Sequence, residues 1–203
     1  VERKEGRLRL PEGDVLLVDL PGVYSLGAAS VDEQIASEFL LTASPRAVVA
    51  VVDASNLERS LYLVVQLLES GAPLVVALNM VDAATERGVR VDAEKLEGLL
   101  GVPVVPTVAR TGDGAEDLKR RLSARIEEGR GRRPLEVPYG RHLTDALGRI
   151  REFLASRLLG AGGLSPDLAA LLAAEGDPRI PKLLDEPGRR LLEQRLEEES
   201  RNL

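Results

Sequence analysis

Short, continuously apolar runs alternate with amphipathic stretches along the first two thirds of the chain. The runs at residues 15–18, 47–52, 73–78 and 103–106 contain no charged residue, which is typical of strands covered on both faces. Stretches of helical spacing separate the later runs, and the connections between them are short. This alternation predicts an α/β fold with a doubly wound, mostly parallel sheet and helices on both of its faces.

Turn and capping residues set the expected bounds of the elements. The turn at residues 11–14 contains Pro and Gly, so the strands at 7–10 and 15–19 are expected to form an antiparallel hairpin. Residues 55–58, Ser-Asn-Leu-Glu, offer a capping box, and Gly71 and Gly101 are expected helix ends. Helices are expected at residues 32–41, 92–100 and 115–128, and another helix is expected to begin at residue 57.

The composition shifts to Gly, Arg and Pro between residues 129 and 140, and a purely helical pattern follows. Ser165-Pro166 predicts a helix start with a proline in its first turn, and a charged helix is expected from about Pro187 to Ser200. We therefore expect a first domain at residues 1–130, a linker at 131–140 and a helical domain at 141–203.

Composition excludes several classes of function. The 203 residues carry a net charge of −6, which argues against non-specific binding of nucleic acid. The absence of Cys excludes disulfides, Cys-based metal sites and thiol catalysis, and a single His excludes a histidine-rich metal site. No apolar run approaches the roughly 18 residues of a membrane span.

The first motif follows the apolar run at residues 15–18. Asp19-Leu20-Pro21-Gly22 has the D-x-x-G spacing with which nucleotide switches sense a phosphate. The carboxylate holds Mg²⁺, usually through a water, and the glycine presents its N–H to the terminal phosphate. Alone the motif is weak, because turns after strands favour Gly and Pro anyway.

The second motif is Asn79-Met80-Val81-Asp82, at the end of another apolar run. An aspartate placed here accepts both the ring N–H and the exocyclic amine of guanine, whereas adenine has no such donor pair. Asn79 is expected to brace the base and the neighbouring phosphate loop, and Met80 keeps the flat apolar contact that Lys usually supplies. By itself, a strand-end turn rich in Asn and Asp explains the motif better than base recognition does.

The third motif is the loop of Val108, Ala109 and Arg110, where a backbone N–H near the small Ala109 can donate to the guanine keto oxygen. Asp19, Asp53, Asn79 and this loop all follow strands, so they are expected to meet at one edge of the sheet. The order and spacing of the three motifs favour a guanine-nucleotide domain over coincidence.

With these motifs in place, the chain resembles the cytosolic amino-terminal region of the bacterial ferrous iron transport protein B family. The residues that carry the resemblance are 19–26 (DLPGVYSL), 32–36 (DEQIA) and 79–82 (NMVD). Residues 1–6 resemble the family's segment just after its switch I threonine. The tail from Gly140 resembles the family's helical domain, which is described as inhibiting nucleotide dissociation.

The resemblance implies a P-loop-NTPase-like domain that binds and hydrolyses GTP to GDP and phosphate and regulates Fe²⁺ uptake. It implies a transmembrane iron-permeation domain as a partner, a place on the cytoplasmic face of the bacterial inner membrane, and it allows a homo-oligomer. By motif match, Asp19 is the Mg²⁺ carboxylate and Gly22 the phosphate sensor. Asn79 and Asp82 read the base, and Val108, Ala109 and Arg110 form the fifth motif.

The phosphate-binding loop (P-loop) of such a domain is absent from the sequence. None of the four lysines follows a glycine, so no G-x-x-x-x-G-K-[ST] loop is present, and the switch I threonine is absent too. In the family the first strand lies between the strands that end at Asp19 and Asp53. We therefore expect a longer protein lacking its first residues here, a separately supplied amino-terminal piece, or a rearranged sheet completed by a partner.

No catalytic residue is assignable from the sequence. Val23 stands where many GTPases place a water-orienting Gln, so hydrolysis in the intact protein would depend on other groups, backbone contacts or a monovalent cation near the P-loop. Glu33 is best explained as favourable charge at a helix start.

Two alternatives stay open. The first is a regulatory or docking module of the same transporter that does not turn over nucleotide. The second is a receiver-like signalling domain, which needs a Lys after its last strand, whereas Lys119 lies inside an expected helix.

Overall fold

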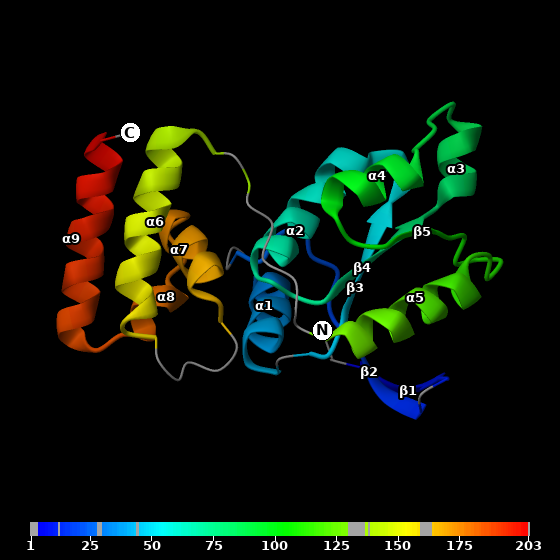
Figure 1. Ribbon diagram of the computed structural model, residues 1–203, viewed down its shortest axis with the longest axis horizontal. Coiled ribbons are helices and arrows are strands. Elements are labelled where there is room, and N and C mark those ends of the chain that lie inside the picture. Colours follow the sequence, from blue (N-terminus) through cyan, green and yellow to red (C-terminus); the bar gives the residue numbers. More distant parts are fainter. Residues whose placement is uncertain are drawn as a thin grey trace. The chain divides into compact units, whose positions relative to one another are not determined.

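The computed structural model describes residues 4–11, 13–27, 30–43, 45–129, 137, 139–158 and 164–202 (Figure 1). The chain forms two compact units: Val1–Ser25 together with Pro45–Leu135, and Leu26–Ser44 together with Glu136–Leu203. Residues 26–44, which the predicted division places in the first domain, thus group with the carboxy-terminal segment. Most of the predicted linker lies outside the described residues.

The first unit begins with the predicted hairpin of β1 (Lys4–Leu10) and β2 (Gly13–Asp19). The strands are antiparallel, with Leu10 opposite Gly13 and Lys4 opposite Asp19. The prediction of the hairpin is confirmed, although β1 begins earlier than expected because the polar residues before Arg7 also pair with β2.

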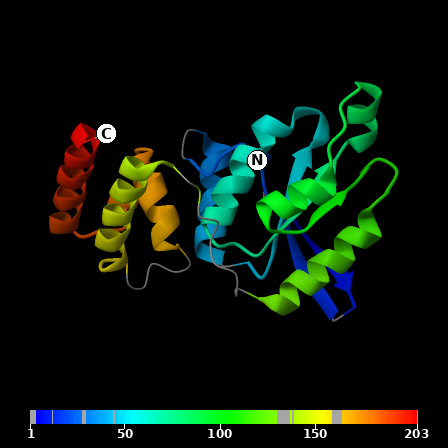
Figure 2. The same ribbon diagram turned by 45° about the horizontal axis from the view of Figure 1, so that its top comes forward.

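A separate three-stranded parallel sheet forms the centre of the first unit, in the order β3-β4-β5. Its strands are β3 (Val48–Asp53), β4 (Leu74–Asn79) and β5 (Val104–Pro106). They alternate with the predicted helices α2 (Leu57–Glu69), α4 (Ala93–Leu100) and α5 (Ala115–Glu128). Two short elements that the sequence did not predict lie between them, the 3₁₀ turn η1 (Ala54–Asn56) and the helix α3 (Val81–Glu86). Figure 2 shows α2 and α4 on one side of the sheet and α5 on the other.

One core of the first unit lies between the sheet and α5. Val75 of β4 and Val105 of β5 are 0% and 1% exposed and pack against Leu122 of α5. Leu8 of β1 packs against the same cluster, so the hairpin is attached to this core through side-chain packing and not through strand pairing. Burying such side chains stabilises the unit by roughly 1.5–3 kcal/mol each.

The expectation that residues 15–18 are covered on both faces is wrong. Leu16 is 65% and Leu17 48% exposed, and Val51 of β3 is 69% exposed. The reason is that β2 and β3 lie in different sheets, so within the described residues neither strand has a neighbour on its outer edge.

Hydrogen bonds from side chains and the positions of glycines determine where the helices of the first unit begin and end. The predicted capping box at residues 55–58 is wrong, because Asn56 and not Ser55 occupies the N-cap position of α2, and the Asn56 side chain makes no capping bond. Instead the Asp53 carboxylate accepts the N–H and the hydroxyl of Ser55, both at 2.8 Å, and begins η1. The predicted ends at Gly71 (φ 72°) and Gly101 (φ 68°) are confirmed, because both adopt the left-handed conformation that suits glycine.

The second unit is helical. It contains α1 (Val31–Ala43), α6 (Arg141–Ala155), α7 (Pro166–Ala174), α8 (Arg179–Lys182) and α9 (Glu186–Asn202). The predicted start of α7 is confirmed, since the Ser165 hydroxyl accepts the N–H of Leu168 at 3.2 Å. Within the described residues, no helix combines the length and apolarity needed to cross a bilayer.

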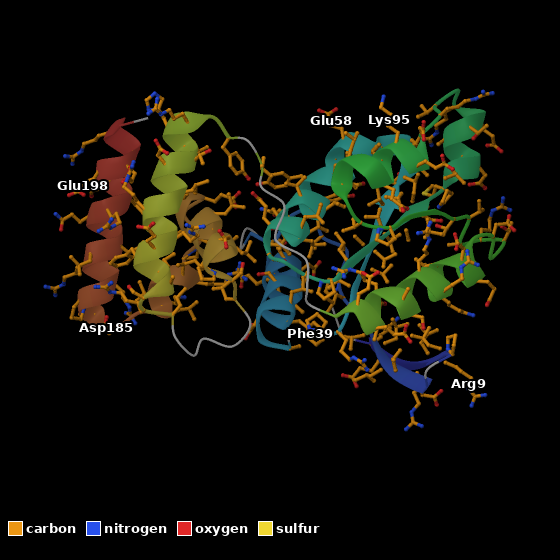
Figure 3. All side chains as sticks on the ribbon, in the orientation of Figure 1. Arg9, Phe39, Glu58, Lys95, Asp185 and Glu198 are labelled. Atoms are coloured by element: carbon orange, nitrogen blue, oxygen red, sulfur yellow. The ribbon has the colours of Figure 1, made fainter. Side chains whose placement is uncertain are left out.

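A partly buried ion pair joins α6 to α9. Glu199 is 8% exposed, and its two oxygens accept the Nε and Nη2 of Arg149 at 2.6 and 2.5 Å. These bonds from Arg149 lower the pKa of the Glu199 carboxyl below its usual range, against the opposing effect of burial. The neighbouring Glu198 lies on the outer side of α9 (Figure 3).

The depressed pKa predicts how stability depends on pH. The contribution of Glu199 is fully present above the carboxyl's unfolded pKa and is lost as pH falls through its lower folded pKa. We expect E199Q to lower the melting temperature at pH 7, with a difference from wild type that shrinks as the pH falls below about 4. Thermal melts of the chain between pH 7 and pH 3 measure this. The matched variant E198Q should change little at any pH; an E199Q deficit that is independent of pH would contradict the account.

Candidate functional site

The turn after β2 places the first motif. Pro21 is buried and anchors the turn, whereas Gly22 is exposed and has no heavy atom within 4 Å of the position a Cβ would occupy. The Arg59 guanidinium of α2 lies over the Tyr24 ring, 3.6 Å from its centroid. This cation–π contact fixes the far side of the turn against α2.

At the end of β3, Asp53 is held by Ser55. The hydrogen bond from the Ser55 hydroxyl, followed by that from its N–H, lowers the pKa of the Asp53 carboxyl. The half-buried carboxylate is therefore charged at neutral pH and faces the region between the strand ends.

At the end of β4 the chain turns sharply into α3, a short helix that the sequence did not predict. Met80 makes this turn with φ 62°, and it is the only non-glycine residue with positive φ in the described part of the chain. Such a conformation costs of order 1–3 kcal/mol, and strained residues of this kind cluster at functional sites. The turn places Asp82 in the first turn of α3, at the carboxyl edge of the sheet.

The loop after β5 is a small closed structure. Val108 pairs with Asp113, and Val108 O accepts the N–H groups of Thr111 and Gly112 at 3.1 and 2.9 Å. Gly114 lies so close to the strand that a Cβ would stand 2.1 Å from Pro106 O. The backbone of this loop is therefore fixed by its own hydrogen bonds and by close packing.

Asn79 joins the second and third motifs. Its Oδ1 accepts the N–H of Ala109 at 3.0 Å and the Thr107 hydroxyl at 3.3 Å. Arg110, the next residue, lies with its Nη2 3.4 Å from Asp82 Oδ2. Residues about thirty positions apart in the sequence thus meet at the edge where β4 and β5 end.

The N–H of Ala109 is engaged in this arrangement. The adjacent N–H of Arg110 has no hydrogen-bond partner in the described part of the structure. Of the amides near Ala109 that the sequence suggested as donors to a ligand, that of Arg110 is the available one.

A cavity of about 270 Å³ lies between the first motif and the ends of β3 and β4. It includes Gly22, Asn79 and Met80 of the predicted site residues. It does not include Asp19, Leu20, Pro21, Val81, Asp82, Val108, Ala109 or Arg110, of which the last four lie along the adjoining edge. The full lining is Gly22, Val23, Tyr24, Val51, Val52, Asp53, Ser60, Asn79 and Met80.

Sequence reasoning missed Ser60 of α2 and the contact between Arg59 and Tyr24. The Asp-x-Ser spacing of Asp53 and Ser55 was the one available signal for the carboxylate held at the end of β3. In the described residues no three His, Cys, Asp or Glu side chains gather as a metal site.

Comparisons with known proteins agree on one family. A sequence profile described as Ferrous iron transport protein B matches residues 1–122. The chain is 41% identical over 200 residues to the Fe(2+) transporter FeoB of Salmonella choleraesuis, covering 92% of this chain and 26% of that protein. It is 50% identical over 123 residues to FeoB of Escherichia coli K12, covering 59% of this chain and 16% of that protein. The chain thus spans about a quarter or less of the length of these curated relatives.

Solved structures of cytosolic domains from the same family are also similar to this chain. The cytosolic domain of L. pneumophila FeoB matches with a TM-score of 0.85 and 37% identity, over 100% of this chain and 78% of that one. The cytosolic domain of T. maritima FeoB in a GDP form has a TM-score of 0.80 and 33% identity, over 100% and 83%. The mGMPPNP-bound NFeoB of S. thermophilus has a TM-score of 0.81 and 32% identity, over 99% and 74%. The predicted P-loop-GTPase-like fold and the predicted resemblance are confirmed.

Proposed function

This chain belongs to the ferrous iron transport protein B family, and we propose that it is the guanine-nucleotide-reading part of a regulatory GTPase in a ferrous iron transporter. The observation that carries the proposal is the bond from Ala109 N–H to Asn79 Oδ1. It joins two motifs at the edge of the sheet where nucleotides bind in such folds.

The base fits the residues at this edge. The Asp82 carboxylate accepts the ring N–H and the amine of guanine, and the N–H of Arg110 donates to the keto oxygen. Met80, 41% exposed, offers its side chain to the flat face of the ring. Asn79 keeps the two loops in register through its bonds to Ala109 and Thr107.

The phosphates and Mg²⁺ belong at the other end of the cavity. Gly22 is exposed, with nothing within 4 Å of the position of a Cβ, and its N–H would donate to a terminal phosphate; Asp19 at the end of β2 would hold Mg²⁺. The cavity of about 270 Å³ is somewhat smaller than the roughly 300–1,000 Å³ typical of small-molecule sites.

GTP supplies the phosphoryl group when bound, and this chain orients it. Val23 cannot orient water, so the attacking water would be positioned by other groups, by backbone contacts or with the help of a monovalent cation. The partner is a transmembrane iron-permeation domain of the same protein, which places this chain on the cytoplasmic face of the bacterial inner membrane.

The test uses the protein extended upstream of Val1 through the P-loop, called here the extended protein. With GTP and Mg²⁺ it should release phosphate, and D19N should slow release at least about tenfold by weakening Mg²⁺ positioning. D14N, an exposed residue of the same hairpin, should have no effect. Tight GTP binding without turnover would favour the docking alternative, and no binding of guanine nucleotide would reject the proposal.

A further inference from the structure

The ion pair between Arg110 and Asp82 has a consequence for nucleotide exchange. Both partners belong to the edge described above, and the carboxylate oxygen that Arg110 faces is one that guanine requires. We infer that Arg110 competes with guanine for the base-reading carboxylate of Asp82, so that the base must displace its side chain to bind. This inference rests on the proposed function and names a residue that sets the affinity for the base.

The Arg110 side chain is free to move, whereas the backbone of the loop that carries it is held in place. The loop is closed by the Val108–Asp113 pairing, by the bond from Thr111 Oγ1 to Asp113 Oδ2 at 2.7 Å, and by the anchoring of Ala109 on Asn79. Arg110 itself projects from this loop with its side chain 82% exposed. Its guanidinium can therefore leave Asp82 without a change in the loop.

The strength of the pair also fits a displaceable contact. The distance of 3.4 Å is long for a charge-assisted hydrogen bond, and Asp82 is 35% exposed. Exposed pairs of this kind are weak, corresponding to roughly 1.4- to 5-fold in an equilibrium constant. Guanine offers the same carboxylate two parallel donors, so we expect it to displace Arg110, and the cost of breaking the ion pair lowers the net affinity by that factor.

Arg110 also carries a positive charge, which attracts the phosphates of any nucleotide. That effect opposes the one inferred here and acts over a distance set by the ionic strength. A matched charge control is Arg90, which is likewise exposed and lies in the same unit. R90Q removes one positive charge without touching Asp82.

The experiment measures GDP affinity and association rate for the extended protein by stopped-flow fluorescence. R110Q should bind GDP about two- to five-fold more tightly than wild type, and this gain should shrink at 0.5 M salt, where the native ion pair is screened. R90Q should bind equally or more weakly. In a D82N background, with xanthosine diphosphate as the probe, replacing Arg110 should give no gain.

Unchanged or weaker GDP binding by R110Q, with wild type binding normally, would overturn this inference and leave the proposed function intact. The same gain in the D82N background would also overturn it, because the effect would then not pass through Asp82. Failure of the wild-type extended protein to bind any guanine nucleotide would reject both.

Discussion

Replacing Asp82 with Asn is expected to change the base that the protein selects from guanine to xanthine. In the proposed site the Asp82 carboxylate accepts two donors from guanine, whereas an amide can accept only one while presenting its own N–H to the other. Xanthine carries a carbonyl where guanine carries the amine, so the amide of D82N pairs with both of its groups. A site built around hydrogen bonds discriminates strongly, because a mismatched base leaves buried polar groups unpaired.

We expect D82N to lose at least about 100-fold in GDP affinity, equivalent to about 2.7 kcal/mol, and to gain a comparable preference for xanthosine diphosphate. Calorimetric titration of the extended protein with both nucleotides measures the change. E86Q, an exposed position on the same helix as Asp82, should leave both affinities unchanged. Equal loss for the two nucleotides would show that Asp82 supports the fold of α3 and does not read the base.

The second large effect is expected at Arg179, which holds the helical unit together. Its Nη2 donates to the Leu26 carbonyl at 2.8 Å, and its guanidinium also bonds the hydroxyl of Ser37. Its Nε lies 2.9 Å from an oxygen of Asp177, whose side chain is 2% exposed. One side chain thus ties α8 to α1 and to the residue that precedes α1 by a short loop.

Removing this guanidinium leaves a buried carboxylate, a buried hydroxyl and a buried carbonyl with fewer partners. We expect R179A to lower the free energy of unfolding of the helical unit by about 3–5 kcal/mol. Urea unfolding of the chain, followed by circular dichroism, measures the loss. R201A, which removes an exposed arginine paired with Glu197, should cost no more than about 1 kcal/mol. A similar small loss for R179A would mean that water replaces its bonds.

Elements whose signals are local were predicted well. Helix α5 begins at Ala115 and ends at Glu128 as the spacing indicated, and α7 begins after Ser165 because a hydroxyl cap and a proline act within one turn. Helix α3 was missed because six residues give too little periodicity and its start depends on the unusual conformation of Met80. The exposure of Leu16 and Val51 was missed because burial of a strand depends on which strand lies beside it.

For the candidate site too, the sequence predicted some features and missed others. The motif order indicated that the turn at Asn79 meets the loop at Ala109, and their bond places both at one edge of the sheet. The sequence did not predict the contacts of Arg59 with Tyr24 or of Arg110 with Asp82. Both depend on the direction taken by a long side chain across elements far apart in the chain, which no local pattern encodes.

The most direct test of the central claim compares how well GDP and ADP compete for the site at the ends of β4 and β5. A fluorescent GDP analogue is bound to the extended protein and displaced by unlabelled GDP or ADP. The account predicts displacement by GDP at a concentration at least about 100-fold lower than by ADP, because only guanine presents paired donors to Asp82. Equal displacement by the two nucleotides, or no binding of the analogue, would contradict it.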